Sequence, residues 1–395
     1  MAAFSPWKNL FEFIFLFCRR SVPTVVFGRC GSVALAWVVR AGSILGMISA
    51  APPTTNQESS SNQVFEVVTP GRLHFGMLSF GQPFGRSFGG LGAMIAGCGV
   101  RVRMRRASQY SAVSHVGERA IGVARRCAAA WGLDEHSCCA IETLEIPRQH
   151  IGLGTGTQLE LAVAAGMQRL YVEGPNGSEQ TYSAKDAAAL AQAAGRGLRS
   201  SVGVYGFGTG GMILEAGKLQ GEVIAPLVSR VALPEAWRVV VFIQREAEGL
   251  HGDAERTAFA GLEMVPLDLT AELTRLAVME ILPAALAARF TDFAAALTAY
   301  GKLAGKPFER ASARLPYAAT TADLFEWLDQ QGIQGYAQSS WGPAVVAVCE
   351  SALAANAVVT AAEAAGLSTR HELIVAEFDN RGSVLREVSD ESLSA

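Results

Sequence analysis

The sequence has little charge and almost no excess of either sign. Only 17% of its 395 residues are charged, 50% are hydrophobic, and the formal net charge is −3. Intrinsic disorder needs a more polar and more highly charged composition, so we expect a folded protein. Nucleic-acid binding usually relies on a basic surface, and the slight acidic excess argues against it. We therefore expect no nucleic-acid partner.

Paired cysteine motifs and long apolar runs are also missing. None of the seven cysteines forms a CxxC pair, which argues against a zinc site of the usual spacing. Their odd number predicts reduced, buried thiols in a cytoplasmic protein. The two apolar stretches near the start, Leu10–Cys18 and Ser32–Val39, are too short for a membrane helix. We expect no membrane partner.

The first 63 residues differ from the rest of the chain. The pair Arg19 and Arg20 separates the two apolar stretches, and a polar leader rich in Pro and Ser, Ala51–Gln63, follows them. A twin-arginine export signal and a peripheral membrane anchor are alternatives. We favour a non-native or disordered N-terminal extension over residues 1–63, with Met47 as the expected start.

The remaining length predicts two domains. We place an N-terminal domain at residues 64–230, a C-terminal domain at 231–380 and a tail at 381–395. Helix and strand patterns alternate without the regular repeat of a doubly wound sheet, and this favours an α+β fold. Val100–Arg106 alternates apolar residues with arginines, as in a half-buried strand. Its arginine face is either solvated or binds phosphate.

Glycine is abundant, and its distribution indicates a ligand. Many of the 41 glycines fall in three clusters, Gly85–Gly99, Gly152–Thr157 and Gly203–Gly211. The second cluster runs from a strand into an expected helix, in which Thr157 and Glu160 have the spacing of a capping box. Backbone N–H groups at a helix N-terminus can bind phosphate, and the alternative is a tight turn with an ordinary cap. The cluster lacks the lysine of a Walker loop and does not match the dinucleotide fingerprint.

Two further patterns add candidate side chains. Arg196, Arg199 and a serine pair precede the third cluster, which we expect to be a mobile loop. Arginine forms bidentate contacts with phosphate, so the loop suits a polyanion, and an ordinary surface loop is the alternative. Arg72 and His74 lie two apart in an extended segment and therefore share one face of a sheet. A structural role is the alternative for this histidine.

Five segments, in order along the chain, carry a resemblance to a known family: PGRLHFGMLSF, FGGLG, HIGLGTGTQLELAVA, GRGLRSSVGVYGFGTGG and QSSWGPAVVAV. From Val64 to Glu377 the chain resembles the β-ribofuranosylaminobenzene 5′-phosphate synthases of the GHMP-kinase structural superfamily. The resemblance implies a two-domain GHMP-kinase-like fold, with an N-terminal α+β sandwich and a C-terminal ferredoxin-like domain. The chain departs from the kinase pattern at Thr155–Gln158, where the kinases carry a serine pair, and again at Gln338–Pro343. Both departures disfavour an ATP-dependent kinase.

The resemblance implies a decarboxylating phosphoribosyl transfer. Such an enzyme joins 5-phosphoribosyl 1-diphosphate to 4-aminobenzoate or 4-hydroxybenzoate and releases carbon dioxide and pyrophosphate, early in tetrahydromethanopterin biosynthesis. Mg²⁺ is the expected cofactor because it commonly bridges diphosphate oxygens. Its protein ligands stay open, and the acidic segment Gln244–Glu255 is either a Mg²⁺ site or a solvated loop. A homodimer is expected from the family alone.

Two other functions are kept as alternatives. One is an ATP-dependent small-molecule kinase of the GHMP class, which shares the fold. The other is a non-catalytic protein that binds a phosphorylated metabolite.

Four residues are the catalytic candidates under the synthase interpretation. Arg72 would neutralise the diphosphate, and Glu246 would stabilise cationic character at the anomeric carbon. His74 and His150 would orient the benzoate or accept the proton of a 4-hydroxyl. The expected substrate-binding residues are Gly90, Gly92, Arg148, Gly152, Gly154, Thr155, Gly156, Thr157, Gln158, Arg199, Ser200, Ser201, Gly210, Gly211, Ser339, Ser340 and Trp341. Trp341 would either stack on the benzoate ring or belong to the core.

Overall fold

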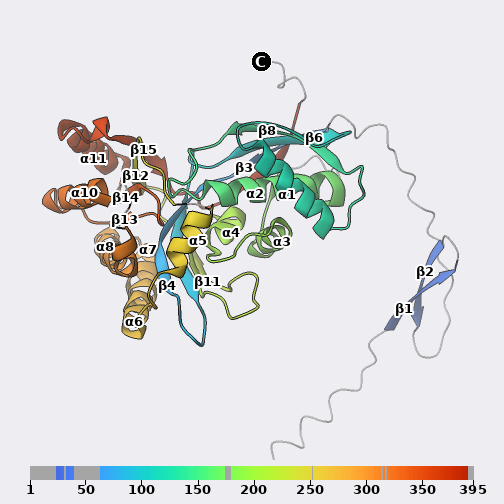
Figure 1. The fold of residues 1–395 in the computed structure, drawn as a ribbon, viewed down its shortest axis with the longest axis horizontal. Helices are drawn as coiled ribbons and strands as arrows, with labels where there is room; N and C mark the ends of the chain where they lie inside the picture. Colours follow the sequence, from blue (N-terminus) through green and yellow to red (C-terminus); the bar gives the residue numbers. More distant parts are fainter. Residues whose placement is uncertain are drawn as a thin grey trace, which may run out of the picture. The chain divides into compact units, whose positions relative to one another are not determined.

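The computed structural model describes residues 24–30, 33–39, 63–173, 179–250, 252–312, 315 and 318–389. The chain divides into two compact units, residues 1–57 and 58–395. In the first unit, β1 (Thr24–Cys30) and β2 (Val33–Val39) form an antiparallel hairpin (Figure 1). The rest of the expected extension, including Leu10–Cys18 and Met47, lies outside the described residues.

The second unit begins with a six-stranded sheet covered by helices on one face. Its strand order is β7-β8-β6-β3-β16-β9, and every pair except β7 with β8 is antiparallel. The strands are β3 (Val64–Val68), β6 (Arg101–Ala107), β7 (Ser111–Val113), β8 (Cys138–Glu145), β9 (Gln180–Thr181) and β16 (Val384–Val388). The helices α1 (Gly117–Ala130), α2 (Thr155–Gln168) and α3 (Ala184–Ala194) share one core with this sheet. The alternation expected for Val100–Arg106 is confirmed, because Val102 and Met104 are buried in that core.

On the other face of β6, Arg101 and Arg103 pair with a buried carboxylate. Glu66 on β3 is fully buried, and it accepts bonds from Arg103 Nε at 2.9 Å and from Arg386 Nη2 at 2.7 Å. Arg101 adds a third ion pair at 3.1 Å. Burial alone would raise the pKa of Glu66, but the hydrogen bonds from the three arginines outweigh it and lower the pKa.

A second, four-stranded sheet corrects the expectation for two glycine clusters. It has the order β11-β10-β5-β4 and comprises β4 (Gly71–Ser79), β5 (Phe88–Ile95), β10 (Met212–Glu215) and β11 (Leu227–Val231). The first cluster forms interior strand β5, in which a Cβ on Gly92 would lie 2.2 Å from the Leu73 carbonyl oxygen. The third cluster forms a buried helix, α4 (Val202–Thr209), and not a mobile loop. Both clusters use glycine for close packing.

The C-terminal half has the strand connections of a ferredoxin-like fold, as expected. Its antiparallel sheet has the order β13-β14-β12-β15, and helices follow the first and third strands along the chain. The strands are β12 (Arg238–Gln244), β13 (Tyr336–Gln338), β14 (Ala344–Cys349) and β15 (His371–Glu377). The helices are α5 (Gly252–Ala260), α6 (Leu267–Arg275), α7 (Leu282–Leu286), α8 (Phe290–Gly305), α9 (Glu309–Ser312), α10 (Ala318–Gln330) and α11 (Ala352–Ala364), with a π-helical turn at Leu276–Ile281.

The second and third sheets share one hydrophobic core. It joins Leu73 and Leu91 of the second sheet to Val239 and Val241 of the third, on both sides of the boundary expected between residues 230 and 231. The domain boundary itself stays a prediction. Residues 384–388, which we expected within a tail, form β16 between β3 and β9. Leu385 is fully buried there, so the end of the described chain completes the first sheet.

Two sequence expectations about cysteines and membranes can be compared with the described residues. Cys98, Cys127, Cys138, Cys139 and Cys349 are free and buried, in agreement with reduced thiols packed as small apolar side chains. In the described part of the chain, no helix has the length and apolar character needed to cross a membrane.

The Glu66 cluster predicts a specific loss of stability. Glu66→Gln should lower the free energy of unfolding by about 2 kcal/mol, because it leaves three partly exposed arginines without their shared carboxylate. Glu145→Gln is the matched control, since Glu145 pairs with Arg101 at an exposed site and should cost less than about 0.5 kcal/mol. Urea denaturation measures both, and equal small losses would contradict this account.

Candidate active site

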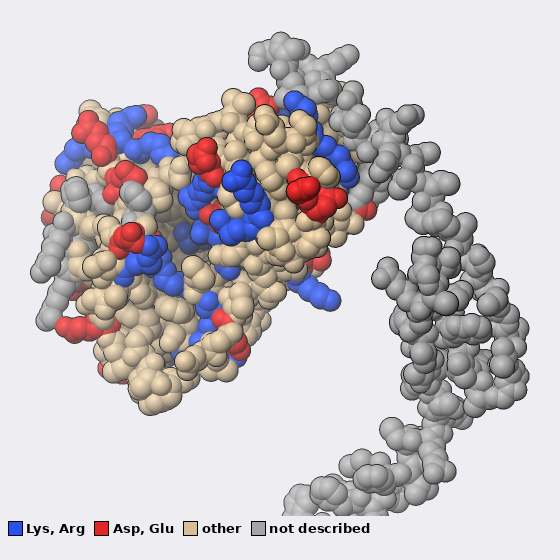
Figure 2. Space-filling model, turned by 45° about the vertical axis from the view of Figure 1, so that its right-hand side comes forward, with Lys and Arg blue, Asp and Glu red and all other residues tan. Residues whose placement is uncertain are grey.

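One large cavity brings together most of the sequence-predicted side chains. It has a volume of about 1780 Å³ and is lined by β4, residues 149–157, residues 196–200, α5, the end of α8 and the turn after β13. Figure 2 shows Lys and Arg side chains gathered around a hollow on one face of the molecule. The basic lining residues are Arg72, Arg119, Arg196, Arg199, Arg256, Lys302 and Lys306, and the acidic ones are Glu255 and Glu309. The excess of positive charge suits an anionic ligand.

The N-terminus of α2 lies in this cavity without a side-chain cap. Gly152 and Gly154 have φ values of 100° and 71°, and Gly154 is the N-cap residue in the left-handed region. This geometry favours glycine, because other L-residues are strained there. The helix begins at Thr155, so the predicted capping box at Thr157 and Glu160 is wrong. The first N–H groups of an uncapped helix remain available to a phosphate.

A buried carboxylate holds several arginines beside this helix start. Glu160 is 5% exposed and accepts a bond of 2.8 Å from Arg119 Nε. Arg126 and Arg196 also pair with it, at 3.3 and 3.5 Å. Arg196 donates to the Thr157 hydroxyl at 2.9 Å, which ties the guanidinium to the first turn of α2. Burial, opposed in part by Glu160, lowers the pKa of Arg196.

Arg72 approaches the same helix start from β4. Its Nη2 donates to Ser340 Oγ at 3.0 Å. Burial, together with the positive charges of Arg196 and Arg199, lowers the pKa of Arg72 to about 10, so it stays charged at neutral pH. Arg72 Nε and Thr155 Oγ1 are buried polar atoms that have no hydrogen-bond partner within the described part of the chain. A bound anion with oxygen acceptors would satisfy such donors.

His74 is a neutral side chain on the wall of the cavity. It is 3% exposed, and its Nε2 lies 3.1 Å from Ser200 Oγ. Its backbone N–H donates to Ser339 Oγ at 3.1 Å, and its carbonyl accepts from Ser340 N–H at 2.8 Å. Burial, and then the nearby charges of Arg72 and Arg199, lowers the pKa of His74 to about 3.

Aromatic rings form another part of the cavity wall. Phe259, Phe308 and Trp341 all line it. The ring centroids of Phe308 and Trp341 lie 5.2 Å apart, and those of Phe259 and Trp341 lie 6.4 Å apart. The Arg199 guanidinium lies over the Phe259 ring at 5.1 Å and pairs with Glu255 at 2.5 Å. We call Phe259, Phe308 and Trp341 the aromatic wall; it adjoins the basic cluster.

The structure places twelve of the predicted site residues on the cavity surface. They are Arg72, His74, His150, Gly152, Gly154, Thr155, Gly156, Thr157, Arg199, Ser200, Ser340 and Trp341. Trp341 was expected either to contact the benzoate or to belong to the core. Its side chain is only partly buried and lines the cavity, so it is not a core residue.

Four other predicted residues do not line the cavity but contact the segments that do. Gln158 donates to the Gly203 carbonyl at 2.9 Å, and Ser339 donates to the Gly152 carbonyl at 2.7 Å. Gly90 gives His74 room, because a Cβ at this position would lie 2.8 Å from His74 Nε2. Ser201 accepts the Ala225 N–H at 3.0 Å.

The remaining predicted residues lie elsewhere. Glu246 is exposed and does not line the cavity, so the structure brings no support for its assigned role. Arg148 donates to the carbonyls of Gln244 and Arg245, and thereby holds that segment in place. Gly92 packs inside the second sheet, while Gly210 and Gly211 form a tight turn against the backbone of residues 379–381 and 231.

Several cavity residues carried no sequence signal strong enough to find them. Arg119 comes from the first turn of an ordinary amphipathic helix, and Phe259 and Phe308 come from segments without a motif. Arg196 was visible beside Arg199, but nothing marked it as the residue that reaches α2. Glu255, within the predicted acidic segment, is the carboxylate that lines the cavity in place of Glu246.

The donor set gives little support to a metal site made by the protein alone. Among the described residues, no group of three or more His, Cys, Asp and Glu side chains is placed to hold a metal ion. Glu255 and the Thr155 hydroxyl are oxygen donors on the cavity surface. Mg²⁺ favours oxygen ligands and often relies on substrate phosphates for most of them. The residues therefore fit an ion that arrives with a diphosphate.

Comparisons with solved structures identify the fold. A homoserine kinase from Cytophaga hutchinsonii matches 84% of this chain and 99% of its own, at 15% identity and a TM-score of 0.57. Mevalonate pyrophosphate decarboxylase from Streptococcus pyogenes matches 81% and 98%, at 11% identity and a TM-score of 0.56. The chain has the GHMP-kinase fold. At these identities the likeness concerns the fold alone.

The similar sequences that the comparison found all carry the same name. The curated β-ribofuranosylphenol 5′-phosphate synthase of Archaeoglobus fulgidus is 27% identical over 214 residues, which are 51% of this chain and 63% of the relative. The synthase of Methanothermobacter thermautotrophicus is 28% identical over 223 residues, 51% of this chain and 64% of the relative. The matched region thus spans slightly less than two thirds of the length of these relatives. No protein-family model matches the chain.

The basic cluster predicts pyrophosphate binding. Calorimetric titration should detect pyrophosphate, and Arg196→Ala should raise the dissociation constant at least about tenfold, because a charged hydrogen bond contributes about 1.5–3 kcal/mol. Arg105→Ala removes the same charge from an exposed position on β6 and should change the constant less than about twofold. Equal weakening by both variants would show that only net charge matters.

The low pKa of His74 predicts a pH-dependent stability. Between pH 6.5 and 4 the unfolded chain protonates this histidine while the native state, with a pKa of about 3, does not. The free energy of unfolding should therefore fall with decreasing pH, by at most about 1.4 kcal/mol per pH unit from this group. His74→Gln should lose that component, while the effect of buried His371, whose pKa is also lowered, remains in both proteins. Parallel stability curves for the two proteins would contradict the assignment.

Proposed function

We propose that the chain catalyses the reaction of a β-ribofuranosylphenol 5′-phosphate synthase. It would join 5-phosphoribosyl 1-diphosphate to 4-hydroxybenzoate or 4-aminobenzoate and release carbon dioxide and pyrophosphate. The observation that carries the proposal is the shared cavity, in which the uncapped start of α2 and its arginines adjoin the aromatic wall. The similarity to synthases of this name supports the same activity.

The basic end of the cavity suits the diphosphate. The backbone N–H groups at the start of α2 and the guanidinium groups of Arg72, Arg119 and Arg196 supply hydrogen-bond donors around one position. These donors would stabilise the negative charge that develops as the bond between the anomeric carbon and the diphosphate oxygen breaks. Bound Mg²⁺ would add charge neutralisation to the diphosphate, and Glu255 and the Thr155 hydroxyl, which line the cavity, would be its protein ligands.

The aromatic wall suits the benzoate ring. Stacked or edge contacts with Phe259, Phe308 and Trp341 would orient a planar arene beside the ribose. The ring carbon that bears the carboxylate would attack the anomeric carbon and form the carbon–carbon bond. The carboxylate then leaves as carbon dioxide, and its bonding electrons restore aromaticity. Positioning therefore contributes more to this reaction than a strong acid or base.

His74 can take part as a hydrogen-bonding group more readily than as a base. Its pKa of about 3 keeps the imidazole neutral and makes it a weak proton acceptor at neutral pH. A neutral imidazole between two arginines does not add to the positive charge of the cavity. His74 would therefore orient a substrate hydroxyl or carboxylate, and His150, which also lines the cavity, is the second candidate for that role.

The assay follows release of the carboxylate. The purified chain is mixed with phosphoribosyl diphosphate, Mg²⁺ and carboxyl-labelled 4-hydroxybenzoate or 4-aminobenzoate, and we expect equal amounts of labelled carbon dioxide and pyrophosphate. Arg199→Ala should raise the KM for phosphoribosyl diphosphate by about tenfold, since a guanidinium at the cavity surface is lost. Arg105→Ala serves as the control for charge.

The other outcomes separate the alternative functions. Absence of labelled carbon dioxide from both arenes would overturn the proposal. Consumption of ATP with a small alcohol would instead support a kinase, for which the shared fold is the supporting observation. Binding of pyrophosphate without any turnover would support a non-catalytic protein.

A further inference from the structure

A buried carboxylate lies directly behind His74 and is not explained by the cavity itself. Glu215 ends β10, is fully buried and does not line the cavity. Its Oε2 accepts the Gly217 N–H at 2.7 Å and its Oε1 accepts the Ser201 N–H at 3.3 Å. The Ser200 hydroxyl lies near enough to the same carboxylate to lower its pKa against the rise caused by burial. The two backbone N–H groups can only donate, so the carboxyl group accepts both of those bonds.

The position of Gly90 shows how near Glu215 and His74 are to each other. A Cβ built on Gly90 would lie 2.8 Å from His74 Nε2 and 3.4 Å from Glu215 Oε1. Both groups therefore converge on the same bare stretch of β5. Ser200 bridges them, because its hydroxyl lies 3.1 Å from His74 Nε2 and also contacts Glu215.

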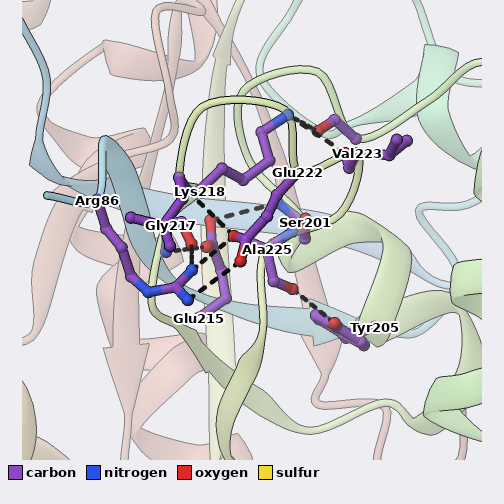
Figure 3. Close-up of polar contacts among 11 residues, drawn as sticks. Arg86, Ser201, Tyr205, Glu215, Gly217, Lys218, Glu222, Val223 and Ala225 are labelled. Carbon is purple, nitrogen blue, oxygen red and sulfur yellow. Dashed lines mark hydrogen bonds and ion pairs between the residues drawn. The ribbon is translucent and has the colours of Figure 1, made fainter.

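The loop after β10 is bonded to the segment between α3 and α4. Figure 3 shows Arg86 and Lys218 around that loop. Arg86 forms a bidentate pair with Glu222 and donates to the Gly217 carbonyl. Lys218 Nζ donates to the carbonyl of Gly197 at 2.6 Å. Since Gly197 lines the cavity, the loop is tied to the segment that carries Arg199 and Ser200.

We propose that Glu215 is a positioning residue that acts through Ser200 to fix the orientation and the proton position of His74. An ionised carboxylate only accepts, so the Ser200 proton is directed to Glu215. The Ser200 oxygen, which already accepts the Val202 N–H at 3.2 Å, then accepts from His74. This places the single proton of the neutral imidazole on Nε2 and leaves Nδ1 as the acceptor.

The hydrogen bonds to Glu215, and not its burial, favour the ionised carboxylate. Taking Glu215 out of water raises its pKa, and the donors around it oppose that rise in part. A carboxylate kept in such a position carries a cost in stability, and holding a second polar group in place is a common reason for retaining one. The effect on catalysis rests on the proposed function, whereas the proton position of His74 does not.

The decisive variants are Glu215→Gln and Ser200→Ala, with Glu222→Gln as the control. A glutamine can donate to Ser200, which allows the serine to donate to His74 Nε2 and moves the imidazole proton to Nδ1. Ser200→Ala breaks the chain without disturbing the backbone contacts of Glu215. Glu222→Gln removes the same charge from the same loop, where the side chain is 33% exposed and pairs with Arg86.

The measurement is nitrogen NMR of the full chain labelled in its histidines, with the His74 signal assigned by His74→Gln. We expect Nε2–H in the wild type and in Glu222→Gln, and a loss of this tautomer in Glu215→Gln and Ser200→Ala. The signal of His371 should not change, and it reports on the fold. An Nδ1–H tautomer in the wild type, or an Nε2–H tautomer kept in both test variants, would overturn the proposal.

A kinetic readout separates this proposal from the proposed function. In the decarboxylation assay, Glu215→Gln should lower kcat at least about tenfold and change the KM for phosphoribosyl diphosphate less than about threefold, because the diphosphate contacts remain. If no variant, nor the wild type, releases carbon dioxide, the proposed reaction fails while the tautomer still decides the role of Glu215. Normal kcat with an altered tautomer would confirm that Glu215 sets the proton position of His74 and would show that this position does not affect catalysis.

Discussion

The convergence of arginines on the start of α2 depends on Glu160. Guanidinium groups as close as those of Arg119, Arg126 and Arg196 repel one another, and a single carboxylate at 5% exposure accepts bonds from all three. The price is a buried charge, which is tolerated because each carboxylate oxygen is paired. The helix dipole makes the electrostatic potential at the start of α2 positive. Because Glu160 holds the three arginines together there, their charges increase that potential. The capping role that the sequence suggested for Glu160 would have removed this property.

The other walls of the cavity are less positively charged than the end formed by the start of α2. Arg72 reaches it from β4, and His74, two residues later on the same strand, stays neutral because it is buried among positive charges. The aromatic wall offers apolar surface in the same cavity, where Arg199 lies over the Phe259 ring. Behind His74, Glu215 provides an acceptor that is screened from the cavity. Charge, hydrogen bonding and apolar contact are thus assigned to different elements of the fold.

The fold class and the segments that line the cavity could be predicted from the sequence. The structural role of each glycine cluster could be predicted only in part. Gly152–Gly154 was predicted correctly as a turn that leads into a helix, since its spacing is a local signal, and phosphate binding there stays a prediction. The glycines of β5 were expected to line a ligand and those of α4 to form a mobile loop. Their close packing against Leu73 and Met94 depends on residues that are distant in the sequence. Partners such as Arg119, Glu160 and Phe259 meet only in the folded chain. Their roles carry no pattern that spacing alone could reveal.

The central claim is that the start of α2 and its arginines bind the diphosphate of the substrate. A crystal structure of the chain with pyrophosphate and Mg²⁺ tests it most directly. The account predicts phosphate oxygens within hydrogen-bonding distance of the backbone N–H groups at Thr155 and Gly156 and of at least two of Arg72, Arg119 and Arg196. Ordered pyrophosphate on another surface, such as the arginine face of β6, with none at the start of α2, would contradict it.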